Sequence, residues 1–251
     1  MDKIAVIAEW IQQSKYLVAF TGAGISTPSG IPDFRSPESG LWNGVDPYEV
    51  ASIFGFRRNP QAFYDWVRPL VHITSEAQPN PAHLALVELE KMGKLKSIIT
   101  QNIDMLHTKA GNTTVFELHG NSDRATCIQC FSEFDGKPIL EKFAEDGEVP
   151  RCPKCNGIIK PNFILFGEQL PYEQLLGAKK ASRAADLMLV IGSSLEVVPA
   201  SELPLLAKRN GAKVVIINSE PTPLDKQVDL LVHGDVAEIL PAIIHCMETI
   251  S

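Results

Sequence analysis

Two segments of the chain are apolar at every position, and they constrain the fold more than any other feature. Residues 188–191 read Met-Leu-Val-Ile, and residues 214–217 read Val-Val-Ile-Ile. A strand with one face in water alternates apolar and polar side chains, whereas a strand covered on both faces is apolar throughout. These segments therefore predict strands inside a sheet that has helices on both faces.

Helical patterns separate the expected strands. We expect strands at residues 16–21, 95–100, 114–118, 158–166, 186–191, 213–218 and 229–233. We expect helices at residues 2–14, 47–54, 60–71, 80–92, 172–185, 199–209 and 235–247. Asn80 is placed to begin the fourth helix and Gly93 to end it. This alternation predicts βαβ units in an open, doubly wound parallel sheet, interrupted only near residues 28–72 and 120–160.

Composition excludes several classes of protein. The chain has 251 residues, of which 45% are apolar and 21% are charged, so extensive disorder is excluded. This length suits one large domain, or one domain that carries a smaller insert. Five cysteines are too sparse for a disulfide scaffold. The net charge of −7 argues against bulk electrostatic binding to a nucleic-acid backbone.

No targeting or membrane segment is expected. Glu9 interrupts the first apolar run, which is unlike a secretory signal. The longest apolar runs are far below the roughly 20 residues that span a bilayer. We therefore expect a cytoplasmic protein with reduced thiols.

Four of the five cysteines form two C-x-x-C pairs, Cys127 with Cys130 and Cys152 with Cys155, separated by 21 residues. Two such pairs place four thiolates at the corners of a tetrahedron, which is the geometry of a closed structural Zn²⁺ site. The alternatives are four unrelated buried thiols and a redox C-x-x-C. Neither pair is directly followed by the start of a helix, which argues against the redox alternative. Cys246 is expected to be a small core residue.

The segment around these cysteines lacks the charge of a nucleic-acid-binding zinc ribbon. Residues 120–160 contain six lysines and arginines and seven acidic residues. A module that binds nucleic acid through its surface charge is basic. Because four cysteines leave no open coordination position, we expect the zinc to be structural rather than catalytic.

A glycine turn follows the first expected strand. Residues 22–27 read Gly-Ala-Gly-Ile-Ser-Thr, in which the third glycine of a dinucleotide fingerprint is missing. Glycines at such a turn let backbone amides approach a pyrophosphate, although a plain tight turn explains the pattern equally well. Residues 28–36 stand where an ordinary NAD dehydrogenase would have a second strand and an acidic residue, so that class is excluded.

Several motifs together resemble the sirtuins, the NAD⁺-dependent protein lysine deacylases. The similar segments are residues 22–26, 30–35 (Gly-Ile-Pro-Asp-Phe-Arg), 101–104 (Gln-Asn-Ile-Asp), 119–120 (His-Gly), 192–195 (Gly-Ser-Ser-Leu), Asn218 and 234–236 (Gly-Asp-Val). They cover nearly the whole chain in the family's order, and the four cysteines follow the histidine as in the family. The short termini resemble a prokaryote-style member.

The resemblance implies how the chain divides into domains. Residues 1–27, 73–119 and 161–251 would form a Rossmann-like NAD-binding domain. A helical module at residues 28–72 and a zinc-binding module at residues 120–160 would form a smaller domain. This division accounts for both interruptions of the strand–helix alternation.

The resemblance also implies the reaction. Acetyl or other neutral acyl groups would be removed from protein lysines, giving nicotinamide, O-acetyl-ADP-ribose and free lysine. His119 would act as general base on a ribose hydroxyl, because a histidine titrates near operating pH. Asn102 would hold the ribose and a water. Without the other motifs, His119 would be interpreted as a core histidine; the remaining histidines are expected to be structural or exposed.

Further residues are implied as NAD contacts. Asp104 and the Ile103 backbone would bind the nicotinamide carboxamide, although Asp104 is also placed to cap a helix. Phe34 would cover the reacting face, Arg35 would meet phosphate, and Asp33 would fix the loop. The full set is Gly22, Ala23, Gly24, Thr27, Asp33, Phe34, Arg35, Gln101, Asn102, Ile103, Asp104, His119, Gly192, Ser193, Ser194, Asn218, Ser219, Asp235 and Val236.

The implied substrate is an acetyl-lysine protein or peptide, bound as an added β-strand between residues 164–168 and 195–198. The candidate contacts are Ile164, Phe166, Gly167, Glu168 and Val197. Members that prefer acidic acyl groups carry Tyr-x-x-Arg in the helical module. Here Arg68 follows Tyr64 one position too late and would point roughly 100° away on a helix. Neutral acyl groups are therefore expected.

Three other functions stay open at this point. The same site could serve a protein ADP-ribosyltransferase or an NAD hydrolase. The chain could instead be a zinc-ribbon nucleic-acid binder, which its charge opposes, or a silent NAD sensor, which His119 and Asn102 oppose. No nucleic-acid or membrane partner is expected. The sequence fixes no oligomeric state, and a monomer is the expectation.

Overall fold

The computed structural model describes residues 2–34 and 40–250. A six-stranded parallel sheet has the order β3-β2-β1-β7-β8-β9. Its strands are β1 (Leu17–Thr21), β2 (Leu95–Thr100), β3 (Val115–Glu117), β7 (Leu187–Ile191), β8 (Lys213–Asn218) and β9 (Leu230–His233). The strands β2 and β3, which follow β1 in the chain, lie on one side of β1. The later strands β7, β8 and β9 lie on its other side. The expected doubly wound, Rossmann-like sheet is confirmed.

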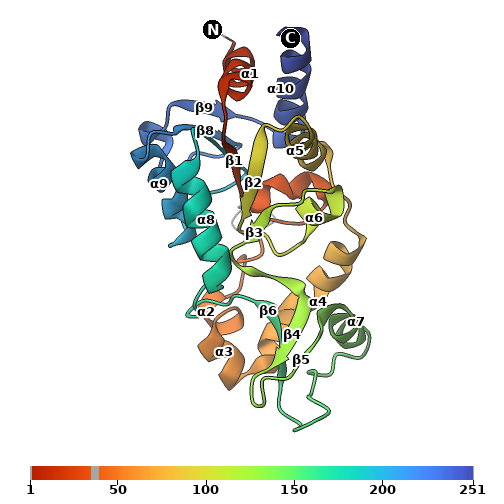
Figure 1. Cartoon of the computed structure of the whole chain (residues 1–251). Coiled ribbons are helices and arrows are strands. Elements are labelled where there is room, and N and C mark those ends of the chain that lie inside the picture. The colour runs from red at the N-terminus through yellow and green to blue at the C-terminus, as the bar shows by residue number, and fades with distance from the viewer. Residues whose placement is uncertain (1, 35–39, 251) are drawn as a thin grey trace.

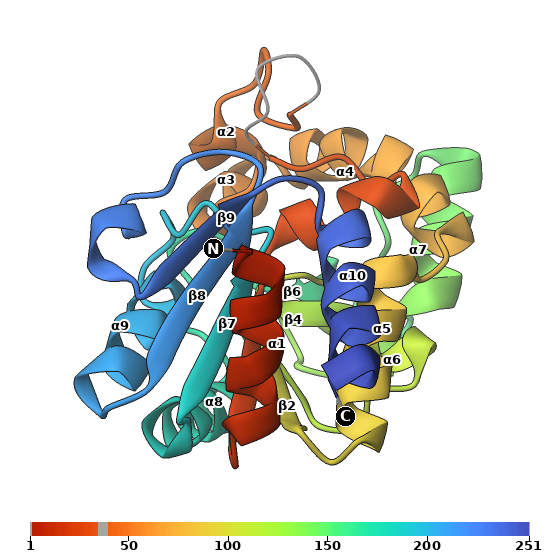
Figure 2. The same ribbon diagram turned by 90° about the horizontal axis from the view of Figure 1, so that it is seen from above.

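Helices cover both faces of this sheet. The helices α1 (Lys3–Gln13), α5 (Pro81–Lys91) and α10 (Val236–Ile250) pack on one face, and α8 (Tyr172–Ala184) and α9 (Leu203–Arg209) pack on the other (Figure 2). Alternate residues of β7 enter the two layers: Leu189 lies in the first core and Val190 in the second. Both are fully buried, which explains why this strand is apolar at every position.

A smaller lobe lies beyond the end of the sheet that is opposite to α1 and α10 (Figure 1). Its antiparallel sheet has the order β5-β4-β6, formed by β5 (Glu133–Asp135), β4 (Gly120–Cys127) and β6 (Ile159–Phe163). The helices are α2 (Pro47–Val50), α3 (Ile53–Arg58), α4 (Pro60–Glu76) and α7 (Gly136–Asp146). Phe56, Phe63, Tyr64 and Phe143 are at most 1% exposed and form its own apolar core.

Several expected boundaries change in the structure. The helix expected at residues 47–54 is two short helices, because Phe166 pairs with the chain at Ser52 and Ser52 Oγ then caps α3 by accepting from Gly55 N. The helix expected to end at residue 71 continues to Glu76. The strand expected at residues 158–166 ends at Phe163, and the helix expected from residue 199 begins with the 3₁₀ turn Ala200–Glu202.

The expected start and stop of the fourth helix are confirmed. Asn80 Oδ1 accepts from Ala82 N at 2.9 Å, and Pro81 occupies the first helical position. Gly93 follows the helix with φ of +72°, a left-handed conformation that favours glycine. The short helix α6 (Leu106–Ala110) packs against this helix. Among the described residues, no helix is long and apolar enough to cross a membrane.

Candidate active site

The site lies where the carboxyl ends of the parallel strands meet the smaller lobe. A cavity of about 1180 Å³ is lined by residues that follow β1, β2, β7 and β8, together with residues of α4 and of the segment after β6. Open α/β sheets bind ligands at this edge, where successive strands diverge. Most of the expected contacts meet here: Gly22, Ala23, Gly24, Asp33, Phe34, Gln101, Asn102, Ile103, Asp104, His119, Ile164, Phe166, Gly167, Glu168, Gly192, Ser193, Ser194, Val197, Asn218 and Ser219.

The glycine turn packs backbone to backbone against the turn after β7. Gly24 N donates to Gly192 O at 2.8 Å, and a Cβ at Gly24 would lie 2.9 Å from Gly192 Cα. Gly192 has φ of +60°, and a Cβ there would lie 2.3 Å from Ile25 N. No other residue fits this approach, so these glycines bring the backbone of both turns to the floor of the cavity, with the amides of Gly22 and Gly24 donating within the protein.

Asn102 stands in a hydrogen-bond network between the turn after β1 and the loop after β2. Its Nδ2 donates to Gly22 O and to Ser26 Oγ, both at 3.1 Å. Ser26 Oγ donates to Asp104 Oδ2 at 2.7 Å. The network holds the Asn102 amide and the Asp104 carboxylate in fixed relative positions. Ser26 was not expected as a site residue, although its place directly after the glycine turn was a usable signal.

Asp104 combines the two roles that the sequence left open. Its Oδ1 accepts from Leu106 N at 2.9 Å, so it stabilises the start of α6. The same residue lines the cavity beside Ile103. Burial raises the pKa of the Asp104 carboxyl, and the hydrogen bonds from Leu106, Ser26 and Asn102 oppose that rise.

His119 follows β3 and reaches the cavity from the opposite side of the β2 loop. Its Nδ1 lies 3.0 Å from Gln101 O, and a carbonyl can only accept, so Nδ1 carries the proton. Burial lowers the pKa of His119, and the bond to Gln101 O opposes that shift. The ring is therefore neutral near pH 7 with a lone pair on Nε2, which is the state that a general base needs.

Residues at the ends of β7 and β8 form the far side of the cavity. Gln101 Nε2 donates to Ser193 Oγ at 2.8 Å, which joins the β2 loop to the β7 turn. Asn218 Nδ2 donates to Glu220 O at 2.7 Å, and the Asn218 side chain is nearly buried. Both side chains stabilise turns and also line the cavity.

An aromatic wall closes the side of the cavity next to the smaller lobe. The rings of Phe34 and Trp42 have centroids 5.1 Å apart, and Trp42 stacks on Trp66 at 5.2 Å. Trp42 also contacts Phe166 at 6.1 Å. The two tryptophans were not expected from the sequence, because only the fold brings the loop before α2 against the face of α4.

The face of α4 toward the cavity carries no charge: it is apolar over most of its length, with Thr74 and Ser75 near its end. Phe63, Trp66 and Val67 line the cavity. Tyr64 is fully buried instead, with its hydroxyl donating to Ile159 O at 2.7 Å. Arg68 donates to Ala144 O and Glu145 O on α7. Neither Tyr64 nor Arg68 lines the cavity, so the described part of α4 places no cation in it.

Gly167 is an exposed position in the segment after β6, and the backbone groups of the two residues before it are engaged within the protein. Phe166 N donates to Ala51 O, and Phe166 O accepts from Ile53 N. Leu165 N donates to Glu168 Oε2 at 2.8 Å. Within the described residues, the backbone of Gly167 makes no hydrogen bond. Gly167 is therefore the position in this segment with a backbone available to an added strand.

The carboxylate of Glu168 holds the segment after β6 in place through an ion pair. Its Oε2 lies 3.1 Å from Lys160 Nζ, and Lys160 is only 9% exposed. Lys160 Nζ also donates to Pro161 O and to Phe163 O. Burial lowers the pKa of Lys160, and the carboxylate of Glu168 opposes that shift.

Three of the expected NAD contacts that the structure describes, Thr27, Asp235 and Val236, are not in the cavity lining. Thr27 Oγ1 donates to Gly24 O, and Asp235 Oδ1 accepts from Ala237 N in the first turn of α10. Val236 is buried in the core beneath α10. Arg35 lies outside the described residues.

The four paired cysteines meet in the smaller lobe, as expected. Cys127 Sγ lies 3.6 Å from Cys155 Sγ, and Cys130 Sγ lies 3.6 Å from Cys152 Sγ. All four sulfurs lie within 4.8 Å of one another. A tetrahedral site with Zn–S bonds of about 2.3 Å has sulfurs about 3.8 Å apart, so the cluster is positioned to bind a zinc ion. The set leaves no open coordination position.

Comparisons with known proteins agree with this geometry. The model of the Sir2 family matches residues 22–199. The NAD-dependent protein deacylase 2 of Archaeoglobus fulgidus is 49% identical over 244 residues, which cover 97% of this chain and 95% of that protein.

Two solved structures are also similar. One, described under "Structural Basis for the Mechanism and Regulation of Sir2 Enzymes", has a TM-score of 0.94 and 47% identity, and the match covers 100% of this chain and 99% of that chain. The other is a Sir2 protein with a deacetylated p53 peptide and 3′-O-acetyl ADP-ribose. Its TM-score is 0.92 at 40% identity, and the match covers 96% of this chain and 97% of that chain.

Proposed function

This chain belongs to the Sir2 family, and from that premise we propose that it removes acetyl and other neutral acyl groups from protein lysines in an NAD-dependent reaction. One observation carries the proposal: a neutral His119 and a fixed Asn102 face one cavity at the strand ends. The related Sir2 protein with a deacetylated peptide and 3′-O-acetyl ADP-ribose supports the same reaction. The products would be nicotinamide, O-acetyl-ADP-ribose and free lysine.

NAD, when bound, supplies the ADP-ribosyl group that accepts the acyl group and the nicotinamide that leaves. The glycine turn lets the backbone at Ala23 approach its phosphates closely, and Ser193 and Asn218 line the end of the cavity assigned to the adenosine half. We assign the other expected contacts in the cavity lining to NAD as well. Thr27, Asp235 and Val236 would contribute through the turns that they stabilise.

His119 acts as the general base. Its Nε2 lone pair takes a proton from a ribose hydroxyl, and the bond from Nδ1 to Gln101 O disperses the positive charge that develops on the ring. The lowered pKa of His119 keeps this nitrogen free at neutral pH.

Asn102 and Asp104 orient the reactants. The Nδ2 of Asn102 is held by Gly22 O and Ser26 Oγ, which leaves its amide oxygen for the ribose and an ordered water. Asp104, fixed by Ser26, and the Ile103 backbone bind the nicotinamide carboxamide. Positioning of this kind lowers the entropic part of the barrier.

The aromatic wall excludes water and favours neutral acyl groups. Phe34, Trp42 and Trp66 enclose the reacting region, which limits wasteful hydrolysis of NAD. An acidic acyl group would bury its carboxylate against Phe63 and Val67 with no cation on α4 to pair with it.

The acyl-lysine peptide binds as an added strand between the segment of Gly167 and the segment of Val197. The backbone groups of Gly167 are available to such a strand. Ile164, Phe166, Glu168 and Val197 line the same cavity. Because strand addition reads the backbone more than the side chains, the sequence preference is loose.

We further propose that residues 1–27, 73–119 and 161–251 act as the NAD-binding domain and that residues 28–72 and 120–160 act as the smaller domain. Their separate apolar cores support this division, although β6 crosses the boundary at residue 161 and pairs with β4. The thiolates of the zinc site favour a reducing, cytoplasmic location, and the protein acts as a monomer.

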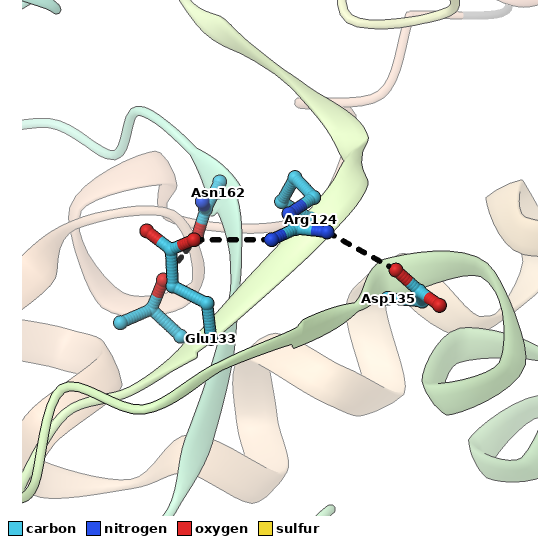
Figure 3. Close-up of polar contacts among 5 residues, drawn as sticks. Arg124, Glu133, Asp135 and Asn162 are labelled. Carbon is cyan, nitrogen blue, oxygen red and sulfur yellow. Dashed lines mark hydrogen bonds and ion pairs between the residues drawn. The ribbon is translucent and has the colours of Figure 1, made fainter.

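Nucleic acid is not proposed as a partner. Arg124, a cation of the zinc-binding module, lies between Glu133 at 3.1 Å and Asp135 at 3.2 Å (Figure 3). Carboxylates on both sides cancel the charge that a phosphate would need. The exposed ion pairs themselves contribute little to stability.

The test is deacetylation of an acetyl-lysine peptide with and without NAD, using the wild type, His119→Ala and His245→Ala. His245 is exposed on α10 and serves as the matched histidine control. We expect NAD-dependent release of lysine and nicotinamide, loss of at least about a hundredfold in kcat for His119→Ala, and little change for His245→Ala. Nicotinamide release without an acylated peptide would instead indicate an ADP-ribosyltransferase or NAD hydrolase.

A further inference from the structure

Two buried histidines lie close to the loop after β2, which carries Asn102, and take no part in the reaction described above. His83 on α5 and His107 on α6 are 0% and 2% exposed, and their ring centroids are 4.9 Å apart. Among the described residues, His83 Nε2 and His107 Nδ1 have no hydrogen-bond partner. A buried polar atom without a partner is costly, so this pair requires an explanation.

The hydrogen bonds of each ring fix where its proton resides. Asn80 N donates to His83 Nδ1 at 3.4 Å, so Nδ1 holds a lone pair and the proton is on Nε2. His107 Nε2 lies 2.9 Å from Thr21 Oγ1, and Thr21 Oγ1 donates its own proton to Thr100 Oγ1. Thr21 therefore accepts from His107 Nε2–H, and His107 Nδ1 holds a lone pair.

The two unpartnered atoms are consequently complementary. His83 Nε2 is a donor and His107 Nδ1 is an acceptor; no hydrogen bond joins them among the described residues, and one buried water between the adjacent rings would satisfy both. A proton added to either ring would place a donor against a donor. Burial lowers the pKa of His83 to about 4 and that of His107 to about 3, so both rings are neutral at physiological pH.

A series of hydrogen bonds leads from His107 to the loop after β2, which carries Asn102. Thr21 and Thr100 are neighbours in the β1–β2 register, and their hydroxyls are 2.9 Å apart. Thr100 Oγ1 accepts from Asn102 N at 3.0 Å. The hydrogen bonds run from His107 through Thr21 and Thr100 to the backbone of Asn102, and His83 packs against the His107 ring.

We propose that His107, whose ring packs against His83, is a positioning residue that fixes the backbone of Asn102 through the hydroxyls of Thr21 and Thr100. His107 orients the Thr21 proton toward Thr100, which leaves a Thr100 lone pair directed at Asn102 N–H. The Asn102 amide then stays against Gly22 and Ser26 in the geometry that the ribose requires. This inference rests on the proposed function for its kinetic consequence, but the proton positions can be measured independently.

The kinetic test uses Thr21→Val, which removes the hydroxyl and preserves the shape. We expect kcat to fall about tenfold, with the KM for the peptide within about twofold, because the loss lies in the positioning of Asn102. Thr21→Ser keeps the hydroxyl and is expected to restore kcat to within about twofold. Ser97→Ala is the matched control: it deletes a buried hydroxyl of the neighbouring strand β2, one without a hydrogen-bond partner among the described residues, and should leave kcat unchanged.

The second test measures the histidine tautomers of the wild type by ¹⁵N NMR. Both His83 and His107 are expected to carry their proton on Nε2 and to stay neutral at pH 6. A proton on His107 Nδ1, or full kcat in Thr21→Val beside an active wild type, would overturn the proposal. A wild type with no NAD-dependent deacetylation would contradict the proposed function instead, and the NMR result would still decide the tautomers.

Discussion

At the scale of single residues, Lys160 shows how one buried charge can hold a substrate-binding segment. Its ammonium contacts Glu168 and two backbone carbonyls, with side-chain exposures of 11% for Lys160 and 21% for Glu168. Glu168 in turn accepts from Leu165 N, so the ion pair fixes both ends of the turn that presents Gly167. Glu168, expected from the sequence as a peptide contact, is in the structure also a support for that contact.

Lys160→Met is expected to lower the free energy of unfolding by about 3 kcal/mol, because it leaves the partly buried carboxylate of Glu168 without its counter-charge. The KM for the peptide should rise as the segment loosens. Denaturant unfolding and steady-state kinetics measure the two effects. Lys208→Met is the control: its pair with Asp229 is 35% and 33% exposed, so a loss of no more than about 1 kcal/mol is expected. Equal losses in both variants would contradict the argument.

The pKa values of His83 and His107 predict how stability depends on pH. Both values lie below the ordinary 6.5, so between about pH 6.5 and the folded-state values the unfolded chain binds more protons than the folded chain. Stability therefore falls as the pH decreases through this window, by up to about 1.4 kcal/mol per pH unit for each histidine. Urea unfolding between pH 7 and pH 4.5 checks the slope. His107→Asn should reduce it, whereas His245→Ala should not.

At the scale of elements, we propose that the cavity-facing side of α4 sets the acyl preference. The wild type is expected to have a higher kcat/KM for acetyl-lysine than for succinyl-lysine, because Phe63, Trp66 and Val67 offer no charge. Val67→Arg places a guanidinium on this face and should raise the succinyl-to-acetyl ratio about tenfold. His72→Arg adds the same charge on an exposed part of α4 and should leave the ratio unchanged. A wild type that prefers succinyl-lysine would refute this interpretation.

The zinc-binding module should depend on its metal for folding. Cys127 ends β4 and is fully buried, so Cys127→Ala removes one ligand from within the β5-β4-β6 sheet. We expect loss of bound zinc and loss of amide protection in β4–β6, with the six-stranded sheet retained. Metal analysis and hydrogen exchange provide the readouts, and Cys246→Ala is the control. Normal zinc content with an unchanged melting curve would argue against a structural metal.

Elements whose pattern is local were predicted well from the sequence. The fully apolar residues 188–191 and 214–217 are central strands, and Asn80 and Gly93 bound their helix as expected. The break between α2 and α3 was missed because its cause is a distant contact: Phe166 pairs with the chain at Ser52. A pattern within residues 47–54 contains no trace of that partner.

The residues of the site divide in the same way, into those that a local motif predicts and those that only the folded chain brings together. His119, Asn102 and the glycines were predicted from the family resemblance, because each sits in a short motif at a strand end, and the structure brings them to one cavity. Trp42 and Trp66 could not, because their stacking joins a loop to a helix across the smaller lobe. Ser26 lay inside a motif, yet its bond to Asp104 depends on two turns meeting in space.

At the scale of the whole molecule, the cavity joins two separately cored units. Its lining combines residues at the strand ends with residues of α4 and of the segment after β6. The strand ends supply the polar groups assigned to NAD, and the smaller lobe supplies the apolar wall. Neither unit forms the site alone, which explains why the two interruptions of the strand–helix alternation fall where they do.

The net charge of −7 leads to the final prediction. An acidic surface attracts cationic protein tails, so the initial rate on a lysine-rich acetyl peptide should exceed that on an uncharged peptide at low salt. Raising NaCl from about 0.05 M to about 0.5 M shortens the screening length severalfold and should lower the first rate several times, because the attraction acts across solvent. The uncharged peptide controls for effects of salt on the enzyme itself. If both rates stay flat, or if both fall equally, steering by net charge plays no part in substrate capture, and recognition rests on strand addition at Gly167 alone.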